Sequence, residues 1–146
     1  MINETFIKRK ISLIQDDLAK FSGLARHSFE EIADDFVKQA AVERFLERVV
    51  NRAIDINQHL IVELASKDTS SPKNYTETFT ILADLGVYPE DFGREISKSV
   101  GTRNILVHEY NKTDNQLIYT SLADCLRDYT KYCEYILEFL NKQKNL

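Results

Sequence analysis

The sequence predicts an all-α protein, a bundle of four main helices plus one short helix. Apolar residues recur at alternating intervals of three and four through most of the 146 residues, as they do on one face of a helix. No segment shows the apolar–polar alternation of a half-buried strand. Only four glycines and two prolines are present, so long uninterrupted helices are expected.

The first two helices follow from apolar spacing. One apolar face runs from Ile7 to Phe21, and this helix is expected to end near Gly23. Between Leu24 and Ser71 there is no glycine or proline, and the helical pattern continues. We therefore expect one helix over residues 29–66, which at 1.5 Å per residue would be about 55 Å long and able to bend or protrude.

A short helix and a fourth helix are expected next. Residues 66–74 have the composition of a loop, and Asn74 with Glu77 resembles a capping box that opens the short helix. Gly86 is suited to closing that helix, and Pro89 is suited to the first turn of the fourth.

The last helix is expected after a loop at residues 111–116. It runs through Ile118 to Phe139, again with apolar or aromatic residues at intervals of four and three. The tyrosines of this helix could stack on bases, but their helical spacing favours core or dimer contacts.

Composition indicates a single soluble domain over residues 1–146. The net charge of −4 argues against a broad surface that coats nucleic acid, although a small basic site remains compatible with it. Cys125 and Cys133 lie eight residues apart in one helical pattern, too far for a disulfide, and are expected to be reduced core residues. There is no signal peptide and no apolar run of membrane-spanning length, so we expect a cytoplasmic protein.

The stretch "RNILVHEY" (103–110) places four polar or polar-tipped residues in an apolar run. At about 100° per residue, His108 lies about 140° around the helix from Arg103, whereas Asn104 and His108 are i,i+4 neighbours. Arg103 and His108 therefore do not stack within one helix. Convergence on one ligand would need the reach of the arginine, fraying of the helix end, or a second copy of the chain across a two-fold axis.

This set of side chains suits RNA cleavage without a metal. His108 can accept a proton from a 2′-hydroxyl near neutral pH, and that oxygen then attacks the adjacent phosphorus. Arg103 can stabilise charge on the phosphoryl oxygens, and Asn104 can orient the imidazole. No cofactor is required, and DNA, which lacks the hydroxyl, would be inert. The alternative is that His108 is only a structural cap at a helix end.

The motif and its surroundings resemble HEPN-domain ribonuclease toxins, in particular the HepT family. "RNILVHEY" resembles the family's R-x4-H-x-Y motif, and residues 36–61 and 75–92 resemble its second and third helices. The resemblance implies catalytic roles for Arg103, His108 and Asn104, and a homodimer whose active cleft lies between two motif helices. It also implies an MntA-like nucleotidyltransferase antitoxin that attaches AMP to Tyr110, and tRNA or mRNA as substrate, with neither membrane nor DNA as a partner.

A rival function is a non-catalytic HEPN module that binds nucleotide or substrate for a nucleotidyltransferase. Other candidate groups have ordinary structural explanations. Asp55 and His59 are i,i+4 and could support the cleft or form half of a metal site, or they could be a packed polar pair. Arg44, Arg48 and Arg52 could follow an RNA backbone, or they could be ion-paired. His27 is expected to lie in a turn.

Overall fold

A computed structural model of the chain describes residues 1–107 and 112–144, without the side chains at 105–107, 112–115, 117 and 118. These residues form six α-helices and one 3-10 helix, and no strand occurs among them. The helices are α1 (Glu4–Phe21), α2 (Phe29–Ala33), α3 (Phe36–Leu64), α4 (Tyr75–Asp84), α5 (Glu90–Val107) and α6 (Lys112–Lys144), with the 3-10 helix at Ser22–Arg26. The prediction of an all-α fold with four main helices is confirmed, with α4 as the short helix and α2 added.

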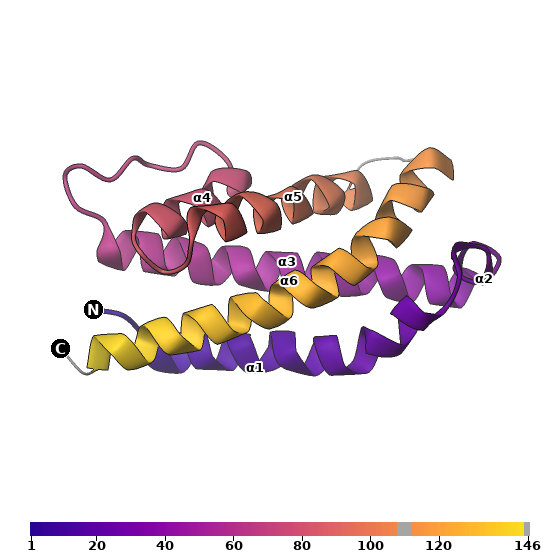
Figure 1. The fold of residues 1–146 in the computed structure, drawn as a ribbon, viewed down its shortest axis with the longest axis horizontal. Helices are drawn as coiled ribbons and strands as arrows, with labels where there is room; N and C mark the ends of the chain where they lie inside the picture. The colour runs from indigo at the N-terminus through magenta and orange to yellow at the C-terminus, as the bar shows by residue number, and fades with distance from the viewer. Residues whose placement is uncertain (108–111, 145–146) are drawn as a thin grey trace.

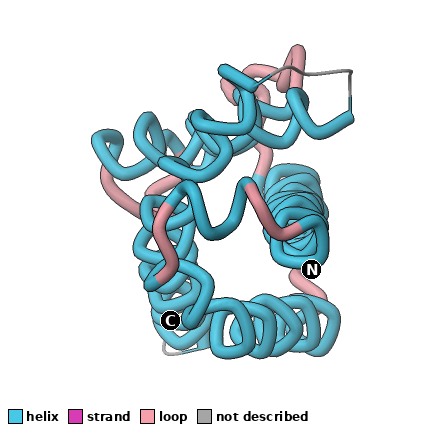
Figure 2. The backbone as a smooth tube through the Cα atoms, turned by 90° about the vertical axis from the view of Figure 1, so that its right-hand side faces the viewer, coloured by secondary structure: helices cyan, strands magenta, loops and turns pink. Residues whose placement is uncertain are grey.

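The long helices α1, α3 and α6 run along the bundle, and α4 and α5 lie together on one side of it (Figure 1). Viewed from the end, the helices surround a common centre (Figure 2). The buried side chains of the core fill this centre. The two chain ends meet at one end of the bundle, where Lys144 Nζ lies 3.2 Å from Glu4 Oε1. None of the described helices has the combination of length and apolarity that crossing a membrane needs.

The prediction of one helix over residues 29–66 is wrong, because the helix is interrupted before Phe36. Asp35 starts α3 as an N-cap: its Oδ1 accepts hydrogen bonds from the backbone N–H groups of Val37, at 3.0 Å, and Lys38, at 3.1 Å. The other carboxylate oxygen lies 2.8 Å from Lys38 Nζ. Aspartate is among the strongest N-cap residues, so the chain leaves the helical conformation here and starts again.

The start of α4 follows the predicted capping box with one difference. Asn74 Oδ1 accepts a hydrogen bond from Glu77 N–H at 2.9 Å, while Glu77 Oε2 accepts one from the N–H of Lys73, at 2.7 Å, and not from that of Asn74. Gly86 closes the α4 turn with φ +84°, a conformation that residues with a Cβ adopt only at a cost. Helix α5 begins at Glu90, directly after Pro89.

The expected loop at residues 111–116 is wrong for residues 112–116, which belong to α6. No glycine or proline occurs from 112 to 144 to stop the helix, and extending an existing helix is much easier than starting one. The resulting 33-residue helix spans about 50 Å at 1.5 Å per residue.

One apolar core joins all six helices. Helix α2 contributes the buried Ile32. The largest fully buried side chains come from the other five helices and are Ile7, Ile11, Ile14, Phe45, Leu46, Ile56, Leu60, Phe79, Leu82, Ile96, Tyr129 and Tyr132. The buried Tyr132 hydroxyl donates to Asn57 Oδ1 at 2.6 Å, and the Tyr129 hydroxyl lies 2.6 Å from Ser99 Oγ. Tyr129 and Tyr132 are therefore core residues and not surfaces for base stacking.

The cysteines and one glycine also follow from this packing. Cys125 and Cys133 are buried and free, as predicted. At Gly93, a Cβ would lie 3.3 Å from Ala83 Cβ, Phe79 O and Tyr88 Cε1. The missing side chain lets α5 approach α4 closely, which sets the position of the helix that carries residues 103–107.

Candidate functional site

Arg103 is held in place by a residue far away in the sequence. Its Nε donates a hydrogen bond to Asn51 Oδ1 at 2.9 Å, joining the C-terminal part of α5 to the middle of α3. Both side chains are partly buried. A hydrogen bond to a charged donor is stronger than a neutral one, so this contact fixes the position of the guanidinium and not only the helix packing.

Two further groups orient the same guanidinium. Its NH1 group donates to Asn104 Oδ1 at 3.1 Å, and its carbon lies 5.2 Å from the centre of the Tyr75 ring. That distance is within the range of a cation–π contact. We call Asn51, Tyr75 and Asn104 the arginine-holding cluster; its members come from α3, α4 and α5.

This arrangement gives Arg103 a defined direction before any ligand arrives. Arginine offers five N–H donors in a planar fork that matches a phosphate, and the contacts described here engage only the Nε and one NH1 donor. A pre-oriented cation of this kind can bind a phosphate or stabilise charge that develops on it. His108 and Tyr110, the other predicted site residues of the motif, lie outside the described residues.

Asn51 and Tyr75 were not identified by sequence reasoning. Asn51 is one of many polar residues on a long amphipathic helix. Tyr75 directly follows the capping residue Asn74, and the capping box already accounted for this stretch of sequence. No local spacing links either residue to Arg103. Their role depends on contacts between separate helices.

Asp55 and His59 do not contact Arg103 in the interactions described for them. Lys10 Nζ lies 2.9 Å from Asp55 Oδ2, and the N–H of Asn3 donates to His59 Nε2 at 2.9 Å. The His59 ring also packs against Phe6, at 5.4 Å between ring centres. Both side chains thus connect α3 to α1 and its N-cap Asn3. The support of the cleft that their i,i+4 spacing suggested stays a prediction.

The arginine ridge on α3 is engaged in ion pairs. Arg48 and Arg52 both reach the buried Asp17 of α1, at 3.3 and 2.7 Å, and Arg44 pairs with Glu47 at 3.3 Å. These contacts favour the ion-pair explanation over an RNA track, although the main acidic partner comes from α1 and not from α3 itself.

His27 contributes to a turn, as expected. Its Nδ1 lies 2.7 Å from Glu31 Oε2, and its carbonyl oxygen accepts a hydrogen bond from the Tyr119 hydroxyl at 2.6 Å. Over residues 1–107 and 112–144, no three His, Cys, Asp or Glu side chains are grouped so that they could hold a metal ion.

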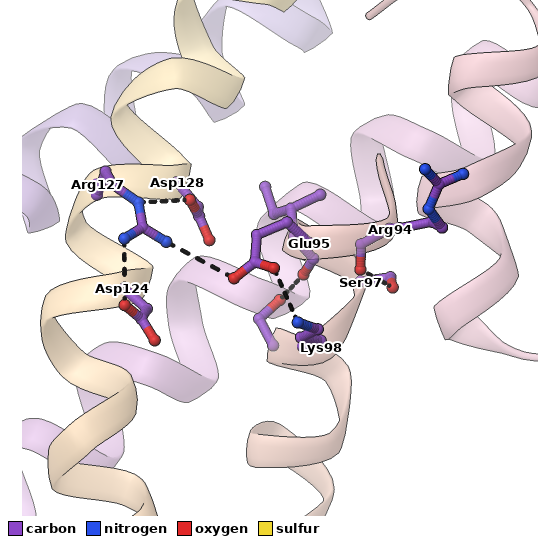
Figure 3. Close-up of polar contacts among 9 residues, drawn as sticks. Arg94, Glu95, Ser97, Lys98, Asp124, Arg127 and Asp128 are labelled. Carbon is purple, nitrogen blue, oxygen red and sulfur yellow. Dashed lines mark hydrogen bonds and ion pairs between the residues drawn. The ribbon is translucent and has the colours of Figure 1, made fainter. Parts of the chain in front are cut away.

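A hollow of about 370 Å³ between α5 and α6 contains more acidic than basic side chains. It is lined by Glu95, Asp124 and Asp128, with Lys98 beside them. Figure 3 shows Arg127 between these carboxylates, at 3.7, 3.3 and 3.0 Å. The hydrogen bond from Lys98 lowers the pKa of Glu95, so this carboxyl stays charged near neutral pH. The carboxylates are thus ion-paired with Lys98 and Arg127, and they outnumber these two cations.

Comparison with known proteins identifies the family of this chain. The family model described as "Ribonuclease HepT-like" matches residues 14–136. A relative named tRNA nuclease HepT, from Aphanizomenon flos-aquae, is 31% identical over 144 residues, covering 95% of this chain and 92% of that protein. A second, named mRNA nuclease HepT, from Shewanella oneidensis, is 26% identical and covers 73% and 77% of the two chains.

Solved structures share the fold. A tri-AMPylated Shewanella oneidensis HEPN toxin, solved in complex with an MNT antitoxin, aligns with a TM-score of 0.77 at 23% identity over 91% of this chain and 97% of that one. YutE of Bacillus subtilis, a cytosolic protein of unknown function, aligns with a TM-score of 0.79 at 19% identity over 97% and 93%. With the family model covering most of its length, the chain belongs to the ribonuclease HepT-like family.

Proposed function

We propose that this protein is a cytoplasmic, homodimeric endoribonuclease toxin that cuts RNA with Arg103 and His108. The observation that carries the proposal is the guanidinium of Arg103, which Asn51, Asn104 and Tyr75 hold in one orientation. Family membership supports it, since relatives are named tRNA and mRNA nucleases. Residues 1–146 are proposed to form one HEPN domain, because helices from both ends of the chain share one core.

The chemistry follows from the two side chains. His108 takes the proton of the ribose 2′-hydroxyl, and the freed oxygen attacks the neighbouring phosphorus. The bond to the 5′-oxygen of the next nucleotide breaks, and that oxygen takes up a proton and leaves as a 5′-hydroxyl. The other fragment ends in a 2′,3′-cyclic phosphate. Arg103 stabilises the negative charge that grows on the phosphoryl oxygens, and its fixed orientation removes the cost of ordering a long side chain during the reaction. No metal enters these steps.

The site is proposed to be completed by a second copy of the chain. Arg103 and His108 differ by about 140° around one helix, so neighbouring motif helices related by a two-fold axis would bring the two groups to one phosphate more readily. Tyr110, seven residues after Arg103, is proposed as the residue that an MntA-like nucleotidyltransferase antitoxin modifies with AMP. The added phosphate would then occupy the space beside the arginine. The Shewanella oneidensis toxin, which is similar in fold, is tri-AMPylated.

The proposal is tested by incubating the pure protein with mixed tRNA and mRNA in EDTA. We expect cleavage that leaves 2′,3′-cyclic phosphate ends, and its loss in His108→Ala and Arg103→Ala. An oligonucleotide with a single 2′-deoxy substitution at the cut position should resist cleavage there. Equal activity of His108→Ala and the unaltered protein would overturn the assignment.

The non-catalytic alternative makes a different prediction from the same held arginine. A binding module would retain RNA or nucleotide in an Arg103-dependent manner and release no new ends. Co-expression with the antitoxin followed by mass spectrometry of the Tyr110 peptide separates the two further, because adenylyl groups on that peptide are expected only if the antitoxin acts on this residue.

A further inference from the structure

A second hollow in the protein differs in charge from the hollow between α5 and α6. A cavity of about 530 Å³ lies beside the arginine-holding cluster, within the range of about 300–1,000 Å³ typical of ligand sites. Its lining comes from α3, α4, α5 and the loop before α4: Gln58, Pro72, Lys73, Asn74, Tyr75, Thr76, Thr78, Val100 and Asn104. Two residues, Tyr75 and Asn104, belong both to this cavity and to the cluster that holds Arg103.

The lining contains a lysine and no carboxylate. This is unusual in a chain with 23 Asp and Glu residues and a net charge of −4. The α5–α6 hollow of Figure 3 makes the contrast plain, since three carboxylates line it. The carboxylate of Glu77 accepts a hydrogen bond from the backbone N–H of Lys73 at 2.7 Å, and Glu77 is not part of the lining. Of these two hollows, only the one beside Arg103 suits a polyanion.

The lining also offers three kinds of contact that single-stranded nucleic acid can use. Tyr75 keeps 43% of its surface exposed although it is a large aromatic residue, so part of its ring remains available for stacking. Gln58, Asn104 and Thr76 carry amide and hydroxyl groups that can bond base edges or ribose. Lys73 supplies a positive charge for a phosphate.

We propose that this cavity is a nucleotide subsite, in which the RNA nucleotide next to the scissile phosphate stacks on Tyr75 while its phosphate pairs with Lys73. The inference rests on the proposed ribonuclease function. Because Tyr75 touches both the subsite and the Arg103 guanidinium, filling the subsite places the scissile phosphate at the arginine. The protein therefore prefers single-stranded RNA that extends beyond the cut bond over a minimal dinucleotide.

The test compares a dinucleotide with oligonucleotides extended by one or two nucleotides on the 5′ or on the 3′ side. We expect extension on one side to raise kcat/KM by about 5-fold to 150-fold, the range that one stacked base gives. Tyr75→Leu and Lys73→Gln should reduce that gain, and Tyr75→Phe should retain most of it. Lys98→Gln, a matched lysine change at the acidic hollow, should not alter the gain.

Two outcomes overturn the subsite while leaving the nuclease intact: no gain from extension on either side, or a Tyr75→Leu defect that is equal for the dinucleotide and the longer substrates. The second would mean that Tyr75 acts only through Arg103.

If the protein cleaves no RNA, the proposed function fails, and the subsite is then judged by binding. The probe is a fluorescent, uncleavable 2′-O-methyl oligonucleotide. Supporting results are weaker binding in Tyr75→Leu than in Tyr75→Phe, and a log–log salt dependence less steep by about 0.7 in Lys73→Gln. Equal binding by all variants would sink the subsite.

Discussion

Asn51→Ala should reduce RNA cleavage without unfolding the protein. The substitution removes the acceptor for Arg103 Nε, a hydrogen bond of 2.9 Å in a partly buried place. A hydrogen bond to a charged group contributes about 1.5–3 kcal/mol, and each 1.36 kcal/mol is a factor of ten in rate. Asn104 and Tyr75 still restrain the guanidinium, so we expect the lower part of that range, a fall in kcat/KM of about 10-fold to 30-fold.

Single-turnover cleavage of one oligonucleotide measures this effect, and thermal unfolding measures stability. A positioning role for Asn51 predicts that the loss lies mainly in kcat, because the held arginine matters most when charge develops on the phosphate.

The control is Asn57→Ala, six residues further along α3, where the amide joins the hydroxyls of Tyr132 and Thr78 at 2.6 and 3.2 Å. It should lower the free energy of unfolding by about 1–3 kcal/mol and leave the activity of the folded protein close to normal. If Asn51→Ala cut RNA at the unaltered rate, the reasoning about Arg103 would be refuted.

Three further predictions concern stability. Burial raises the pKa of Cys125 and Cys133 to about 12, against about 8.5 in an unfolded chain. Because the thiols of the unfolded chain ionise first, their contribution to the free energy of unfolding is fully present below about pH 8.5. Urea titrations should show that this free energy falls by about 1.4 kcal/mol per thiol between pH 7.5 and 9.5, and Cys→Ala variants should abolish the fall. Asp17→Asn leaves its two arginine partners uncompensated and should cost about 1–3 kcal/mol in chemical unfolding, so an unchanged midpoint would contradict the buried ion pair. Gly86→Ala should destabilise by about 1–2 kcal/mol because φ is +84°, whereas Gly101→Ala, in helix α5 with open space around it, should stabilise slightly; the same sign for both would refute the backbone argument.

The fold was predictable where local signals and the core pattern agree. Asn74 as a cap, Gly86 as a turn and buried free cysteines all follow from short-range chemistry, and the structure confirms them. The two errors come from rival local signals. At Asp35 a strong cap interrupts a continuing apolar period, and at 112–116 a polar run is helical because nothing in it stops a helix.

The site was predictable only in its motif. Arg103 stands out as a charged residue in an apolar run, but Asn51 lies 52 residues earlier in the chain, and no periodicity connects the two. The spacing of Asp55 and His59 gives the face of a helix but not what packs on that face, so their contacts with Lys10 and Asn3 were not predictable from it.

Helix α6 completes the packing of the motif helix, which the earlier helices α3 and α4 begin. Ser99 of α5 meets the Tyr129 hydroxyl at 2.6 Å, and Thr102 donates to Ser121 Oγ at 3.3 Å, so part of the support of α5 comes from a segment that is synthesised after it. We expect a fragment that ends before residue 112, and so lacks α6, to be inactive when expressed. On the proposed function, an enzyme that destroys RNA would then have no working form until the ribosome has released α6.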